Sequence, residues 1–252
     1  MIKAGSAALF AALLTVAGSV AAAPAPSPKL SPLTGAPEGI DWSGVWATQP
    51  GRSGQEWLPA DAPQTPEYKA LQDKLVASQA AGKADFEPAA NCEPLGMPRF
   101  MNNVYGMEVW HRPGAFGIYG EYPGFMRRIF VDGRALPSVD EVDPSYYGYS
   151  VGHWEGKDLV VDTIAIKGNV LLSREGVQIS DSASVHERFH QVDKETLTDT
   201  MTLTDPKALT RPWTITKTYK RSPEIDMMEY FCENNRHPTN ADGTVTTILK
   251  SN

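Results

Sequence analysis

Cysteine is scarce in this sequence, and no long apolar run follows its first residues. Two of its 252 residues are cysteine. Neither has a partner at C-x-x-C spacing, which argues against a redox or metal-binding thiol site. Beyond the N-terminal segment, no window is apolar over the about 20 residues that a membrane-spanning helix needs. We therefore expect no membrane partner once that segment is cleaved.

Nucleotide and cofactor motifs are also missing. The sequence contains no Gly-rich phosphate loop, no G-x-S-x-G elbow, no haem motif and no dinucleotide fingerprint, so we expect no cofactor and find no support for a kinase or an oxidoreductase. Basic charge is low as well, since 23 Lys and Arg stand against 30 Asp and Glu. Nucleic acid needs clustered basic side chains to replace its counterions, and we exclude it as a partner.

The N-terminus has the pattern of a secretory signal peptide over residues 1–23. Lys3 precedes a continuous apolar run, and an Ala-Ala-Ala cleavage site ends at Ala23. We therefore predict a periplasmic or secreted protein. Residues 24–40 contain repeated prolines among Ser and Gly, a composition that buries little apolar surface, and we expect them to form a disordered leader.

Residues 41–252 are predicted to form a single, mainly β domain, an antiparallel β-barrel with one helix near residues 66–81. Thr65 is a capping residue before Pro66, which suits a first helical turn. From about residue 99, apolar and polar residues alternate with a period of two, which is typical of β-strands. We expect strands near 104–111, 115–122, 126–131, 147–154, 158–165, 170–178, 184–192, 196–204, 212–221 and 226–232. Closure is favoured because an open sheet leaves two unprotected edges.

Residues 186–190, His-Glu-Arg-Phe-His, spell the H-E-x-x-H motif of zinc hydrolases. That chemistry needs a helix, where residues four apart lie about 6 Å apart on one face; in a strand they are about 13 Å apart. Val185, Glu187 and Phe189 alternate with polar residues, and a Thr-rich arm follows at 196–204. We predict a hairpin and no metal, although a capping box of Ser184 and Glu187 leaves the helical alternative open.

The segment GHWEGKDLVVDT at residues 152–163 resembles the hairpin of a family of secreted bacterial proteins. Further matches lie at 128–134, at 187–189, and at Asp205-Pro206 with Arg211-Pro212-Trp213, so the resemblance spans about residues 92–235. It implies no particular reaction, and His186 and His190 are not part of the family pattern. Separately, Trp42-Ser43-Gly44-Val45-Trp46 is similar to the G-x-W opening of lipocalins, which implies a lipocalin-like barrel.

Several polar side chains are candidates for chemistry inside such a barrel. Glu187 shares a face with Val185 and Phe189, so we expect it to be buried, as a catalytic acid or base or as half of an ion pair with Arg128 or Arg211. His153 at a strand end is a second candidate base. Candidate ligand-binding aromatic residues are Tyr146, Tyr147, Tyr149, Trp154 and Phe189.

Three functions remain open from these residues. The first is a barrel that binds a small apolar or aromatic molecule and acts on it as a cofactor-free isomerase, lyase or hydratase. In this enzyme Glu187 or His153 would act as the base, and Arg128 or Arg188 would stabilise the negative charge that develops in the transition state. The second is a carrier that binds the same class of molecule unchanged. The third is a zinc hydrolase that uses His186, Glu187 and His190. An inward, unpaired acid–base pair favours the enzyme, and a wholly apolar interior favours the carrier.

We predict that Cys92 and Cys232 form a disulfide, because an exported chain folds under oxidising conditions. Two buried free thiols are the alternative. The bridge is expected to stabilise the protein by about 4–5 kcal/mol, because it closes a long loop. Intact mass before and after alkylation of the native, periplasmically expressed protein measures this directly. Two alkylated thiols would contradict the prediction.

Overall fold

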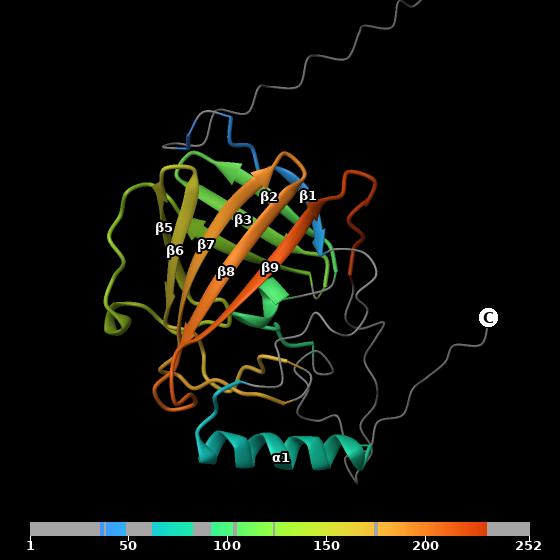
Figure 1. The fold of residues 1–252 in the computed structure, drawn as a ribbon, viewed down its shortest axis with the longest axis vertical. Helices are drawn as coiled ribbons and strands as arrows, with labels where there is room; N and C mark the ends of the chain where they lie inside the picture. The colour runs from blue at the N-terminus through green and yellow to red at the C-terminus, as the bar shows by residue number, and fades with distance from the viewer. Residues whose placement is uncertain are drawn as a thin grey trace, which may run out of the picture. The chain divides into compact units, whose positions relative to one another are not determined.

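Nine strands form a closed barrel in a computed structural model that describes residues 36–37, 39–48, 62–82, 92–102, 105–122, 124–173 and 176–230. The strands follow one another around the barrel in chain order (Figure 1). They are β1 Gly44–Thr48, β2 Met107–Arg112, β3 Ala115–Gly120, β4 Phe125–Phe130, β5 Tyr149–Glu155, β6 Asp158–Ile164, β7 Ser184–Asp193, β8 Thr196–Thr204 and β9 Trp213–Arg221. The prediction of a mainly β barrel is confirmed.

The barrel is mixed rather than antiparallel throughout. Strands β4 and β5 are parallel, and the other neighbours are antiparallel. The expectation of an antiparallel barrel is therefore wrong at one seam. Residues 131–148, which include the 3₁₀ helix η3 Val139–Glu141, carry the chain back along the barrel before β5 begins. Only Ile129 with Ser150 and Phe130 with Val151 are paired across this seam.

The H-E-x-x-H segment lies in β7, which pairs with β8 from Ser184 and Thr204 to Asp193 and Thr196. The predicted hairpin is confirmed, and the helical alternative is wrong. Successive side chains of a strand point to opposite faces. Glu187 is accordingly buried, whereas the side chains of His186 and His190 are 52% and 51% exposed.

Two of the expected strands are not formed within the described residues. Residues 170–173 and 176–178 are joined by an isolated bridge between Leu171 and Gln178 and by a backbone hydrogen bond from Leu172 to Val177 at 2.6 Å, so the chain turns back on itself where one strand was expected. Residues 226–230 contain no strand, and 231–232 lie outside the described residues. Strand β1, in contrast, was not among the expected strands, and the G-x-W segment forms its first three residues.

The predicted helix is confirmed as α1 Pro66–Ala80. Thr65 precedes it, but its hydroxyl donates to the backbone oxygen of Lys207 at 3.0 Å rather than to the helix. Its amide donates to the backbone oxygen of Ala208 at 2.8 Å, and Figure 1 shows α1 beyond one end of the barrel. Gln72 alone is buried in α1, so the apolar side chains of this helix contribute little to the core. Within the described ranges, no helix is long and apolar enough to cross a membrane.

At the end of the barrel where β1 begins, Trp46 and Arg221 hold the backbone segment that precedes β1. Trp46 is fully buried, and its indole N–H donates to the backbone oxygen of Trp42 at 2.9 Å. The guanidinium of Arg221 lies 4.5 Å from the centroid of the Trp46 ring, a cation–π contact. It also donates to the backbone oxygens of Ser43 and Asp41, at 2.6 and 2.8 Å. These bonds hold the backbone of residues 41–43 against this end of the barrel.

The opposite end is filled by residues 95–102, which include the 3₁₀ helix η2 Arg99–Asn102. All four residues of η2 are buried. The ring of Phe100 lies against Gly120 at the end of β3, where an added Cβ would come within 2.6 Å of it. The hydroxyl of Tyr219 on β9 donates to the backbone oxygen of Met101. The barrel therefore has a packed segment at this end rather than an open mouth.

Candidate functional site

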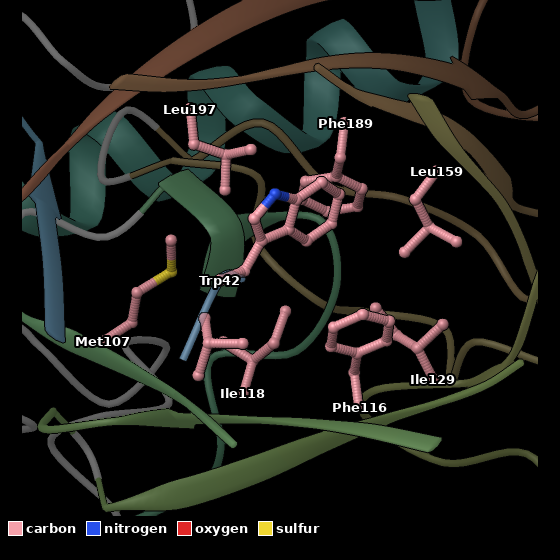
Figure 2. A pocket seen from close by; sticks show the side chains of 9 residues that line it. Trp42, Met107, Phe116, Ile118, Ile129, Leu159, Phe189 and Leu197 are labelled. Carbon is pink, nitrogen blue, oxygen red and sulfur yellow. The ribbon is translucent and has the colours of Figure 1, made fainter. Parts of the chain in front are cut away.

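A small apolar cavity lies inside the barrel, near the end where β1 begins. Figure 2 shows its lining, which comes from six strands and the segment before β1: Trp42, Met107, Val109, Phe116, Ile118, Ile129, Leu159, Phe189 and Leu197. The cavity volume is about 10 Å³, roughly the space that one water centre needs. Side chains therefore fill nearly all of this half of the barrel.

Trp42 occupies the centre of this apolar end. Its side chain is 3% exposed, and its ring centroid lies 5.6 Å from that of Phe116, 5.3 Å from Trp154 and 5.9 Å from Phe189. Its indole N–H donates to the Oε1 atom of Gln191 at 3.0 Å, at the rim of the barrel. An aromatic side chain from outside the strands thus fills the centre of the apolar end.

A buried ion pair lies deeper in the barrel. Arg127 on β4 donates from Nη1 to Glu187 Oε1 at 2.8 Å and from Nη2 to Glu187 Oε2, and both side chains are 0% exposed. Arg127 Nη2 also donates to the hydroxyls of Ser150 and Thr163, at 3.3 and 3.0 Å. A forked guanidinium–carboxylate pair satisfies both charges. The expected partners of Glu187, Arg128 and Arg211, are therefore wrong.

Asp199 on β8 is a second buried acid beside this pair. Within the described part of the chain, neither of its carboxyl oxygens has a hydrogen-bond donor. Burial first, and then the negative charge of Glu187, raise the pKa of Asp199 well above its ordinary value of 3.8, while Arg127 opposes that shift. A protonated Asp199 is able to donate to Glu187, which a second carboxylate cannot do.

Strand spacing places these charged groups one layer below the apolar cavity. Residues two apart on a strand share a face, and the cavity residues Ile129, Phe189 and Leu197 lie two positions from Arg127, Glu187 and Asp199 respectively. Phe189 and Asp199 are also direct partners across β7 and β8. The interior therefore has an apolar layer at the β1 end and an ionic layer next to it.

The other predicted catalytic residues lie on the outer face of the barrel. The side chain of His153 is 60% exposed and contacts Glu155 at 3.2 Å. Arg188 pairs with Glu155 and with Asp158, the latter at 3.0 Å, and Arg128 is exposed. The structure does not bring these three residues to Glu187, because the alternation that buries Glu187 turns its neighbour Arg188 outward.

Of the predicted ligand-binding residues, Phe189 lines the cavity and Trp154 packs against Trp42. The three tyrosines do not line it. Tyr146 bonds with Glu93 and Lys167, and Tyr149 accepts a hydrogen bond from Arg134. Tyr147 packs edge-on against Phe100 in the other half of the barrel.

The histidines of the H-E-x-x-H segment each bond to an acid on the outer face. His186 Nδ1 lies 2.8 Å from Asp162, and His190 Nδ1 lies 2.7 Å from Asp158. No group of three or more His, Cys, Asp or Glu side chains is placed to hold a metal ion among the residues that the structure describes. The strand separates the two imidazoles, as the two-residue period predicts.

Sequence reasoning missed Arg127, Asp199 and Trp42. A signal for Asp199 was present, because Leu197, Asp199, Met201 and Leu203 occupy alternate positions of the Thr-rich arm and share its buried face. Arg128 was predicted in place of Arg127, because the sequence alone does not show which of two adjacent arginines faces inward. The fold and site thus define a closed mixed β-barrel with an apolar end and an internal ion pair.

Comparisons with known proteins add little to this description. No protein-family model and no curated protein matches the sequence. Among solved structures, the wild-type fluorescent protein UnaG aligns over 72% of this chain and 97% of its own, with 14% identity and a TM-score of 0.29. A mutant of UnaG aligns over 72% and 96%, with 14% identity and a TM-score of 0.30. At these values the likeness carries no argument about function.

Glu187→Gln is expected to lower the free energy of unfolding by about 3–5 kcal/mol, because it leaves the charge of Arg127 buried without a counter-charge. Urea denaturation measures the loss. Glu155→Gln is the matched control, since Glu155 pairs with Arg188 at 49% exposure and an exposed pair contributes only about 0–1 kcal/mol. Similar small losses in both variants would contradict a stabilising internal pair.

Asp199→Asn is expected to make stability less dependent on pH. Because the pKa of Asp199 is raised in the folded state, the folded protein binds more protons than the unfolded chain as pH rises above about 4, and stability must fall with rising pH there. The asparagine variant lacks this proton, so it should lose less stability than the wild type as pH rises above about 4. Parallel slopes for the two proteins would contradict the assignment.

Proposed function

We propose that this barrel binds a small apolar or aromatic molecule at its β1 end. The observation that carries the proposal is the cavity lined by nine apolar side chains, at the end of the barrel that Trp42 fills. Apolar lining with few polar groups is typical of small-molecule sites. A molecule larger than water requires a lining side chain to move, and Trp42 is the one that comes from outside the strands.

A carrier fits the arrangement of polar groups better than an enzyme based on Glu187. Both oxygens of Glu187 accept hydrogen bonds from Arg127, and this positive partner favours the ionised carboxylate, which makes Glu187 a weaker base. His153 and Arg188 lie on the outer face. The base and the arginines of the predicted enzyme are therefore not assembled around the cavity.

Cofactor-free acid catalysis is a second candidate because of Asp199. Its carboxyl lacks a donor among the described groups and has a raised pKa, and it lies across from the cavity residue Phe189. Such an acid gives a proton to a bound substrate and takes one back, as an isomerase requires. In that case Asp199→Asn removes turnover of an apolar carbonyl compound and leaves binding unchanged.

We further propose that the protein is exported and belongs to the secreted bacterial family that its hairpin at residues 152–163 resembles. The pattern of residues 1–23 supports export, although that segment lies outside the described residues. The described part of the chain contains no free cysteine, which agrees with a disulfide at Cys92. Its predicted partner, Cys232, lies outside the described residues.

Binding of the neutral fluorophore phenylnaphthylamine tests the proposed function. The wild type should bind it saturably, and Ile118→Ala, which enlarges the cavity, should bind it more tightly at a stability cost of about 2–5 kcal/mol. Leu172→Ala is the matched control, because Leu172 is fully buried but does not line the cavity. It should lose similar stability without a gain in affinity. Equal affinities for all three proteins would overturn the proposal.

A further inference from the structure

A second hollow lies outside the apolar cavity at the same end of the barrel. It is lined by Gly39, Asp41, Gln191, Lys194, Glu195 and Arg221, and its volume is about 250 Å³. Its lining is mostly charged, in contrast to the wholly apolar inner cavity. We refer to it as the outer pocket. It is large enough to hold part of a small molecule.

The outer pocket and the inner cavity are separated by Trp42 and Gln191. Gln191 lines the outer pocket and accepts the hydrogen bond from the indole of Trp42, and Trp42 lines the inner cavity. The backbone beside Trp42 is held by Arg221 through Ser43 and Asp41. The indole itself has a single hydrogen bond, to Gln191. Rotation of this one side chain would therefore join the two hollows without moving the barrel.

The outer pocket is lined by two basic residues, Lys194 and Arg221, and by two acidic ones, Asp41 and Glu195. Arg221 already donates to three backbone oxygens, those of Lys194, Ser43 and Asp41. Lys194, in contrast, is exposed, and its ammonium has no acid in ion-pair contact among the described residues. An ammonium in a pocket next to an apolar cavity suits the anionic head of an amphipathic molecule.

We propose, on the basis of the proposed binding function, that Trp42 is a gate and that the ligand is amphipathic. Its planar aromatic body replaces the indole among Phe116, Trp154 and Phe189, and its anionic head lies in the outer pocket beside Lys194. While the site is empty, the indole of Trp42 occupies the space of the aromatic body, and its hydrogen bond to Gln191 keeps the gate closed. The entrance is then at the β1 end of the barrel.

Two fluorophores of similar shape test this gate, the anionic anilinonaphthalene sulfonate and the neutral phenylnaphthylamine. Trp42→Ala is expected to bind both at least tenfold more tightly than the wild type. Adding Lys194→Gln to Trp42→Ala should weaken binding of the anionic probe several-fold and leave binding of the neutral probe unchanged. Trp110→Ala is the control, because Trp110 is 55% exposed on β2 and does not line either hollow. It should bind as the wild type does.

Gln191→Leu keeps the gate residue and removes the acceptor of its hydrogen bond, so it is informative even if Trp42→Ala does not fold. Stopped-flow mixing should show faster association of the neutral probe with Gln191→Leu than with the wild type. A cooperative thermal melt confirms that the variant is folded, because loosened proteins also bind such probes. If Ile118→Ala changes affinity but Trp42→Ala and Gln191→Leu do not change affinity or rate, the binding function stands and the gate is wrong. If none of them changes binding, the binding site itself is wrong.

Discussion

The buried pair of Arg127 and Glu187 is the interaction on which the interior of the barrel depends. A charge in a protein interior is costly unless it is paired and hydrogen-bonded. Here the guanidinium also bonds to Ser150 and Thr163, so one side chain from β4 connects β5, β6 and β7. This connection crosses the parallel seam of β4 and β5, where the backbones share only two residue pairs. Side chains thus reinforce the place where the sheet is weakest.

The same pair divides the interior into two regions. On the β1 side the lining is wholly apolar around Trp42, and on the other side residues 95–102 fill the barrel. Polar groups in the ionic layer are not all satisfied, since Asp199 has no donor among the described residues. An apolar layer with an adjoining acid is the arrangement on which the proposed binding of a small molecule rests. His153, which was predicted to be a catalytic base, lies on the outer face in a surface ion pair with Glu155.

Much of the fold could be predicted from local pattern. The hairpin of β7 and β8 follows from strict alternation, and α1 follows from Thr65 and Pro66 before a run of helix-forming residues. The parallel seam could not be predicted, because the direction of β5 depends on how residues 131–148 pack and not on any local motif. Residues 170–178 have the composition of a strand, but Leu171 and Gln178 pair with each other in an antiparallel bridge, so the chain reverses direction within the expected strand.

The candidate site was harder to predict than the fold. Burial of Glu187 follows from alternation, but its partner Arg127 depends on the register of strands sixty positions apart in the chain. Trp42 fills the barrel from outside the strands, and no periodicity signals that position.

The most direct test of binding at the β1 end is a set of nuclear Overhauser effects between bound phenylnaphthylamine and methyl-labelled protein. Contacts to Ile118, Ile129, Leu159 and Leu197 are expected, because these residues line the cavity. Contacts to Met97 and Met101 instead would place the ligand at the opposite end and contradict this expectation.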